Sequence, residues 1–217
     1  MADLLDELAG SYRTVAAVSG RPVAFLARHL PGSVTLSGLY GLESLVDGVV
    51  QDHPEAERWR QIVHEAAVAC GAEAEPGGSL EGMGVECKGL SLTLHVRTHP
   101  ELEAAVGAFA AKVAATSGLE SRPAKRSVEL HPPIGVDKGT ALRALSAGAR
   151  GAVYVGDDLG DLAAFDALGA LVSEGALDIG LRVAVGGPEL PDEVRRRVTA
   201  VLAGPEAVPD LLRALRP

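Results

Sequence analysis

Three aspartates follow a short apolar run within five residues of one another. The segment YVGDDLGDLAAFDAL begins at Tyr154, and its apolar run stops at a glycine before Asp157 and Asp158, with Asp161 three residues later. Carboxylates this close repel one another, and a favourable place at a helix N-terminus explains only one of them. A Mg²⁺ ion binds one or two carboxylates together with waters and substrate phosphate. The cluster therefore predicts a magnesium site.

A second polar cluster, Ser19-Gly20-Arg21, follows the apolar run TVAAV at 14–18. A hydroxyl, a backbone N–H and the N-terminus of a following helix together suit an anion. The alternative is that Ser19 only caps that helix. The residues themselves leave both interpretations open.

A third candidate is Lys138, in the segment GVDKGTAL, at the start of a predicted helix. A cation at this end of a helix opposes the helix dipole. Lys138 is either a solvated surface lysine or a clamp for phosphate, with its ammonium group acting as a point charge.

These clusters need strands that carry them to one edge of a sheet, because open parallel sheets bind ligands beyond the carboxyl ends of their strands. Short apolar runs alternate with helical patterns near both ends of the chain, which is typical of strand–helix–strand units. The expected strands are 14–18 (buried), 33–43, 152–156 and 181–187. The expected helices are 22–30, 137–148 and 161–169, the last closed by Gly169, and two more finish the chain.

The middle of the chain has a different pattern. The segment LSLTLHVR (90–97) places leucines and a valine on one face and polar side chains on the other, which indicates a half-buried antiparallel strand. Helical patterns at 53–70 and 100–116 and a strand at 126–130 accompany it. We therefore predict an α/β fold with a parallel-sheet core at 1–46 and 129–217, interrupted by an inserted α+β domain at 47–128.

Composition narrows the classes of partner. The 217 residues carry a net charge of −9, which argues against nucleic acid or an anionic membrane surface. No apolar run reaches the roughly 18 residues needed to span a bilayer. The first ten residues hold three acids, unlike a signal peptide, so a cytoplasmic protein is expected. Cys70 and Cys87 lack CxxC spacing and are expected to be buried, reduced thiols.

The order of these motifs resembles the haloacid dehalogenase (HAD) superfamily of phosphatases. The segments VSGRP, LYGLE, VECKGLSLTLHVR, VELHPPIGVDKGTAL and VYVGDDLGDLAAFDAL resemble bacterial trehalose-6-phosphate phosphatases, over about residues 12–215. The resemblance implies a HAD-like Rossmannoid parallel-sheet core, with the insertion as a cap domain that closes over the sugar.

For the core, the resemblance implies roles in phosphate binding. Ser19 would hydrogen-bond the transferring phosphoryl group, helped by the Gly20 N–H, and Arg21 would support that loop. Lys138 would neutralise the phosphate and the charge that develops on it.

For the aspartates, the resemblance implies that Asp157 binds Mg²⁺ directly. Asp158 and Asp161 would hold the waters of the metal and the catalytic lysine. Mg²⁺ is the only cofactor that the resemblance implies.

In the insertion, Glu86, Lys88 and Arg97 match E-x-K…R positions that contact sugar hydroxyls in the family, and Glu129 matches a glutamate that reaches the sugar. The alternative for the first three is a solvated strand face. Glu86 and Lys88 share one face of an extended chain, however, and polyol recognition needs such paired donors and acceptors.

The sequence departs from the family in one respect. The superfamily uses a D-x-D-G-T motif after its first strand, with an aspartate nucleophile and an aspartate general acid/base. No such motif precedes Ser19, and Asp3 and Asp6 have the wrong spacing. The expectation is a chain that begins one strand too late, through a misassigned start, a fragment or gene decay, and that is poorly soluble and nearly inactive.

The leading hypothesis is a Mg²⁺-dependent, monomeric trehalose-6-phosphate phosphatase, impaired by the absent nucleophile motif. One alternative is another HAD sugar-phosphate phosphatase with a different cap specificity. The other is a non-catalytic or decayed protein that binds a sugar phosphate. In each case the partner is a small molecule, with no nucleic acid and no membrane.

Overall fold

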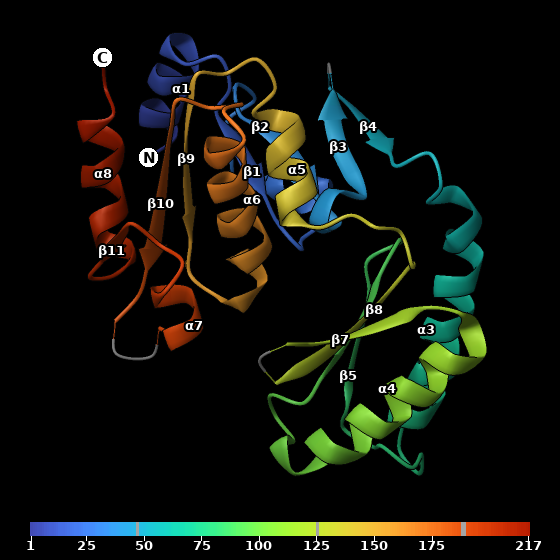
Figure 1. The fold of residues 1–217 in the computed structure, drawn as a ribbon. Helices are drawn as coiled ribbons and strands as arrows, with labels where there is room; N and C mark the ends of the chain where they lie inside the picture. The colour runs from blue at the N-terminus through green and yellow to red at the C-terminus, as the bar shows by residue number, and fades with distance from the viewer. Residues whose placement is uncertain (47, 125, 188–189) are drawn as a thin grey trace. The chain divides into compact units, whose positions relative to one another are not determined.

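The computed structural model describes residues 1–46, 48–124, 126–187 and 190–217, which form two compact units (Figure 1). One unit comprises residues 1–51 and 136–217, and the other comprises 52–135. The predicted insertion starts at residue 47, outside the described residues, and its predicted end at 128 falls inside a strand. That strand, β8 (Ser127–His131), pairs with its neighbours through His131, and the second unit extends to residue 135.

The first unit contains two separate sheets. One has the order β1-β2-β3-β4, with β1 (Ala16–Val18) parallel to β2 (Thr35–Gly38). The strands β3 (Glu43–Val46) and β4 (Val49–Asp52) complete it, and β3 runs antiparallel to β2. The sequence pattern did not predict this pair of strands.

The other sheet of the first unit is parallel throughout, in the order β11-β10-β9. Its strands are β9 (Gly151–Gly156), β10 (Ile179–Val185) and β11 (Ala200–Leu202). The parallel strands predicted at both ends of the chain are therefore confirmed.

Six α-helices belong to the first unit among the described residues. They are α1 (Ala2–Ser11), α2 (Val23–Leu26), α5 (Lys138–Leu145), α6 (Leu162–Ser173), α7 (Asp192–Arg195) and α8 (Val208–Ala214). Helix α6 packs Phe165 and Leu168 into the core. The prediction that it ends at Gly169 is wrong, because the following apolar turn buries Leu171, and Gly169 leaves room for the Arg182 guanidinium group.

The second unit is a two-layer α+β structure. Its antiparallel sheet has the order β5-β6-β8-β7, formed by β5 (Gly84–Cys87), β6 (Leu92–His95), β8 (Ser127–His131) and β7 (Glu120–Ala124). Helices α3 (Arg60–Ala74) and α4 (Glu103–Ser117) cover its apolar face. The predicted alternation is confirmed, since Leu90, Leu92, Leu94 and Val96 are all buried in this unit.

Three sequence expectations about burial need correction. The polar face of the sheet is not simply solvated, since Ser91 and Thr93 are as buried as the leucines. Strand β1 is half-exposed instead of buried, because it borders a cavity. Cys70 is buried as expected, but Cys87 is exposed, and both thiols are free.

No helix in the described part of the chain combines the length and apolar character needed to cross a bilayer.

Candidate active site

One cavity of the first unit brings together residues from all three predicted polar clusters. Its volume is about 1130 Å³, and Ser19, Lys138, Asp157 and Asp161 line it together with strands β1 and β9. Ser19 follows the carboxyl end of β1, and Asp157 follows the carboxyl end of β9. This is where parallel strands present ligand-binding groups.

Asp161 is the organising residue of this site. Its Oδ1 accepts hydrogen bonds from the Lys138 ammonium group at 2.7 Å and from the Tyr154 hydroxyl at 2.7 Å. Its Oδ2 accepts from the backbone N–H groups of Asp157 at 2.9 Å and Asp158 at 3.2 Å. With four donors on two oxygens, the buried Asp161 carboxylate holds the lysine and the loop in place.

The electrostatics of this network keep Asp161 ionised. Burial alone would raise its pKa, but the Lys138 charge and the donated hydrogen bonds outweigh burial and lower the pKa of Asp161. Burial and the adjacent Asp161 charge raise the pKa of Tyr154 far above its usual range, so its hydroxyl remains a donor. Lys138 and Asp161 therefore form an ion pair beside the cavity.

Two glycines allow the close approaches on which the network depends. A Cβ atom at Gly156 would lie 2.4 Å from the Asp161 Cγ atom, so only glycine lets the carboxylate fold back onto the strand end. A Cβ atom at Gly139 would lie 2.5 Å from the Ala163 carbonyl oxygen. Gly139 thus lets α5 pack closely on α6. This close packing brings Lys138, on α5, to Asp161.

Lys138 is the first residue of α5, and a capping box fixes that end of the helix. The Asp137 carboxylate accepts from the Thr140 N–H at 2.8 Å, and the Thr140 hydroxyl oxygen accepts from the Asp137 N–H at 2.8 Å. The lysine side chain is largely buried, with 13% of its area exposed. The interpretation of Lys138 as a solvated surface lysine is therefore wrong.

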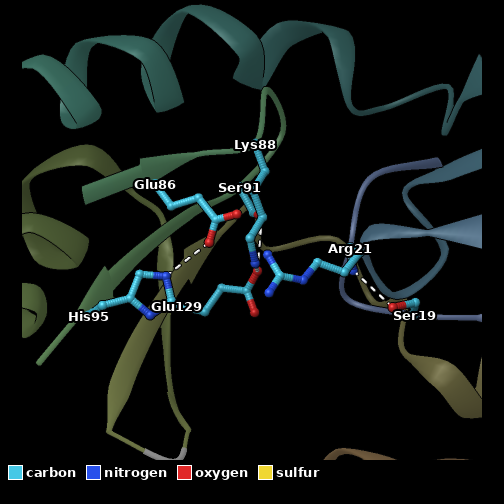
Figure 2. Close-up of polar contacts among 7 residues, drawn as sticks. All are labelled: Ser19, Arg21, Glu86, Lys88, Ser91, His95 and Glu129. Carbon is cyan, nitrogen blue, oxygen red and sulfur yellow. Dashed lines mark hydrogen bonds and ion pairs between the residues drawn. The ribbon is translucent and has the colours of Figure 1, made fainter. Parts of the chain in front are cut away.

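The Ser19-Gly20-Arg21 segment forms a tight turn at the carboxyl end of β1. The Ser19 hydroxyl accepts from the Arg21 N–H at 3.1 Å (Figure 2). It does not cap α2, because the Glu43 carboxylate accepts from the Val23 N–H at 2.9 Å. The cap interpretation of Ser19 therefore fails, and a glutamate from β3 serves that helix.

Gly20 is required by the aromatic side chain beside it. A Cβ atom at Gly20 would lie 2.5 Å from the Tyr40 ring. Tyr40 itself has a φ of 60°, in the left-handed region that a bulky residue rarely adopts. The residues after β2 thus adopt a strained backbone at the point where Tyr40 covers Gly20.

Asp157 and Asp158 remain as candidate metal ligands. Carboxylate oxygens of these two residues and Asp161 lie within 4.8 Å of one another, and Asp157 and Asp158 are exposed. Partial loss of hydration raises the pKa of Asp158, the neighbouring carboxylates add to the rise, and Lys138 opposes it. Hard cations take such oxygens, so the donor set fits Mg²⁺. The Asp157 carboxylate is exposed, whereas the Asp161 oxygens are held by other donors.

The polar face of the second unit holds a separate group of predicted residues. The buried Lys88 ammonium group donates to Glu129 Oε1 at 3.2 Å, and the Ser91 hydroxyl donates to the same oxygen at 2.9 Å. Both side chains extend toward Glu129 in Figure 2. A solvated strand face does not describe this pair, because only 8% and 6% of the lysine and glutamate side chains are exposed.

Glu86 has a partner that the sequence left unassigned. Its carboxylate lies 2.9 Å from His95 Nε2, across neighbouring strands and on the same polar face (Figure 2). Both side chains are about one-third exposed. Glu86 therefore remains accessible, with its direction set by His95.

A family model described as trehalose-phosphatase matches residues 1–183. The chain belongs to the trehalose-phosphatase family. Trehalose-phosphate phosphatases of Mycobacterium ulcerans and Mycobacterium marinum are each 32% identical to it over an alignment of 168 residues. The matches cover 71% of this chain and 42% of each relative. The chain thus spans less than half the length of these curated relatives.

Solved structures agree with this family at the level of the fold. A trehalose-6-phosphate phosphatase related protein covers 100% of this chain and 87% of its own, with a TM-score of 0.75 and 22% identity. The C-terminal domain of Candida albicans trehalose-6-phosphate phosphatase covers 99% of this chain and 82% of its own, with a TM-score of 0.72 and 20% identity. The predicted HAD-like α/β fold is confirmed.

Among the residues predicted from the family resemblance, Arg97 stands apart. It is exposed and lies two residues beyond the end of β6, so its role stays a prediction. Sequence reasoning also missed Tyr154, Ser91 and the positioning of Glu86 by His95. Alternation along 90–97 placed Ser91 and His95 on the correct face, but it gave no sign of their partners.

Proposed function

We propose that this member of the trehalose-phosphatase family hydrolyses trehalose 6-phosphate, with Mg²⁺, to trehalose and phosphate. The observation that carries the proposal is the meeting of Ser19, Lys138 and Asp157 at one cavity. A hydroxyl, an ammonium group and a carboxylate suited to Mg²⁺ are the groups that a phosphate monoester needs.

The core residues supply binding and charge in this proposal. Lys138 uses one of its three N–H donors on Asp161, which leaves the others for phosphate oxygens. Because Asp161 fixes the ammonium group, little side-chain entropy is lost when phosphate binds. Ser19 donates its hydroxyl to another phosphate oxygen, and the N–H of Gly20 adds a second donor.

Mg²⁺, when bound, neutralises charge on the phosphoryl oxygens and orients the group for in-line displacement. Asp157 would hold the ion directly, and Asp158 would hold its waters. Arg21 supports the Ser19 turn.

The sugar is assigned to the polar face of the second unit. Glu86 and Glu129 accept hydrogen bonds from sugar hydroxyls, and Lys88 donates to them. A site built to hydrogen-bond sugar hydroxyls discriminates strongly against ligands that leave its polar groups unpaired. Arg97 is the remaining predicted sugar contact.

A second candidate, sugar-phosphate binding with little turnover, follows from one sequence observation. None of the 217 residues forms the D-x-D-G-T motif that provides the nucleophile in the superfamily. Positioning and electrostatics accelerate only a reaction that has a nucleophile. We expect these 217 residues to hydrolyse trehalose 6-phosphate well below the ordinary enzymatic rates of about 1–10³ per second.

Phosphate release from trehalose 6-phosphate, measured beside calorimetric binding, separates the two candidates. Release at ordinary rates that Asp157→Asn abolishes would establish the phosphatase in this chain. Binding without release would favour the second candidate. Fusion of the chain to a strand that carries D-x-D-G-T should then raise the rate of phosphate release. The reason is that β1 and β9 both border the cavity, and each is an edge strand of its sheet among the described residues.

The assembly and location of the protein belong to the same proposal. We expect a cytoplasmic monomer whose partner is a small sugar phosphate. Light scattering of the purified protein tests the oligomeric state.

A further inference from the structure

The hydroxyl of Thr93 is buried without a hydrogen-bond partner in the described part of the chain. Only 4% of this residue is exposed. A buried hydroxyl without a partner destabilises a fold, because it gives up its hydrogen bonds to water and gains none in return. Valine has nearly the same shape and would avoid this cost, so the hydroxyl needs an explanation other than packing.

The strand register places Thr93 at the centre of the polar face of the second unit. Thr93 pairs with Glu86 on β5 and with Glu129 on β8. Directly opposite residues point to the same side of a sheet, with Cβ atoms about 4.5–5.5 Å apart. The hydroxyl therefore lies in a row between two of the carboxylates that the proposed function assigns to the sugar.

A second unpaired atom lies on the same face. The His131 side chain is buried, its Nδ1 lies 2.8 Å from the Pro132 carbonyl oxygen, and its Nε2 has no hydrogen-bond partner among the described residues. The Nδ1 atom must carry the proton that it donates to the carbonyl. Because burial and the Arg122 charge lower the pKa of His131, its Nε2 is an acceptor at neutral pH.

The Glu120 carboxylate lies 3.7 Å from His131 Nε2, which is too long for a hydrogen bond. The face therefore offers one hydroxyl and one imidazole nitrogen that the protein leaves unsatisfied. They lie beside donors and acceptors that the protein already positions, Lys88 and Glu129 among them.

We propose that Thr93 is a specificity-determining residue whose hydroxyl bonds a hydroxyl group of the bound sugar, and that His131 Nε2 accepts from a second one. This inference rests on the proposed function and extends it by two contacts. Neutral hydroxyl groups suit the face, because a Thr hydroxyl both donates and accepts while a neutral imidazole nitrogen accepts.

A first experiment measures the stability of the unliganded protein. Thr93→Val removes the unpaired hydroxyl and keeps the side-chain shape, so the melting temperature should stay equal or rise. A structural hydroxyl would give the opposite result, a clear drop in melting temperature. Thr35→Val, on strand β2 of the first unit, is the matched control for the change in β-propensity.

A second experiment titrates each variant with trehalose 6-phosphate, glucose 6-phosphate and inorganic phosphate in the presence of Mg²⁺. Thr93→Val should weaken binding of the preferred sugar phosphate about three- to tenfold, as for one neutral hydrogen bond, and leave phosphate binding unchanged. Thr93→Ser, which keeps the hydroxyl, and Thr35→Val should bind within about twofold of the native chain.

The outcomes separate this inference from the proposed function. Equal binding of the preferred sugar phosphate by the native chain and a folded Thr93→Val variant would overturn the Thr93 contact, whichever sugar is preferred. Preference for glucose 6-phosphate over trehalose 6-phosphate would overturn the trehalose assignment, while a loss in Thr93→Val would still support the contact. A native chain that binds no sugar phosphate would overturn both.

Discussion

At the scale of single residues, the aspartates of the cluster differ in their hydrogen-bond partners and in their exposure. Asp161 has both oxygens engaged by donors of the protein, whereas Asp157 is exposed beside the same cavity. Proximity in sequence would not have separated these roles. Hydrogen bonds assign the buried carboxylate to the lysine, and the proposed function assigns the exposed one to a cation.

Asp157→Asn should weaken Mg²⁺ binding by roughly 10–100-fold, because the variant loses an anionic oxygen ligand. Calorimetric titration with Mg²⁺ measures the change. The matched control is Asp166→Asn, which also removes one carboxylate but from an exposed pair with Arg197. Undiminished Mg²⁺ binding in Asp157→Asn, or an equal loss in both variants, would contradict the assignment.

At the scale of elements, the turn after β9 depends on the absence of a side chain at Gly156. Gly156→Ala places a methyl group 2.4 Å from the Asp161 Cγ atom and should destabilise the protein by about 1–3 kcal/mol, as overpacking does. Urea unfolding measures this loss. The control is Gly71→Ala, in the interior of α3 with open space around it, which should stabilise by up to about 1 kcal/mol.

If Gly156→Ala unfolds at the same urea concentration as the native chain, the prediction is contradicted. The Asp161 carboxylate would then move freely away from the added methyl group. The close contact between Gly156 and Asp161 would then not explain how Lys138 is held at the end of β9.

Elements differ in how far the sequence predicts them. Alternation along 90–97 predicted which residues of β6 are buried, because one side of that strand packs on helices. The same pattern missed the burial of Ser91 and Thr93, because a local pattern does not encode the neighbouring strands. Glu129 on β8 accepts a hydrogen bond from Ser91 and lies opposite Thr93. Helix α6 extends past Gly169, where the sequence predicted its end, for a related reason. Tertiary packing of the following turn overrides the local stop signal.

The candidate site was predictable in composition more than in geometry. Motif order placed Ser19, Lys138 and Asp157 at strand and helix ends, where ligands bind. Their meeting at one cavity depends on two close contacts that no local pattern encodes. Gly139 lets α5 approach Ala163 of α6, and Gly156 lets Asp161 fold back onto the strand end. The sequence did not identify Tyr154 as a site residue, because a tyrosine within an apolar strand is equally typical of a core position.

At the scale of the whole molecule, the stability should fall as the pH drops below neutrality. Burial and Arg122 lower the pKa of His131 from its usual value of 6.5, against the opposing charges of Glu120 and Glu129. Between the two pKa values, His131 therefore binds a proton in the unfolded chain but not in the folded chain. The contribution of His131 to the free energy of unfolding should decrease as the pH falls below about 6.5. It should level off below the folded-state pKa of His131.

Denaturant unfolding between pH 5 and 8 measures that slope. His131→Gln should flatten it, because glutamine does not titrate, while His64→Gln, at an exposed position of α3, should leave it unchanged. An identical slope in the native chain and His131→Gln would assign the pH dependence to other groups.

The most direct test of the central claim is calorimetric competition between trehalose 6-phosphate and inorganic phosphate in the presence of Mg²⁺. If the proposed sugar contacts form, trehalose 6-phosphate should bind at least about tenfold more tightly than inorganic phosphate does, the value of one or two additional hydrogen bonds. Glu86→Ala should remove that advantage without weakening phosphate. Trehalose 6-phosphate that binds no more tightly than phosphate to the native chain would contradict the account.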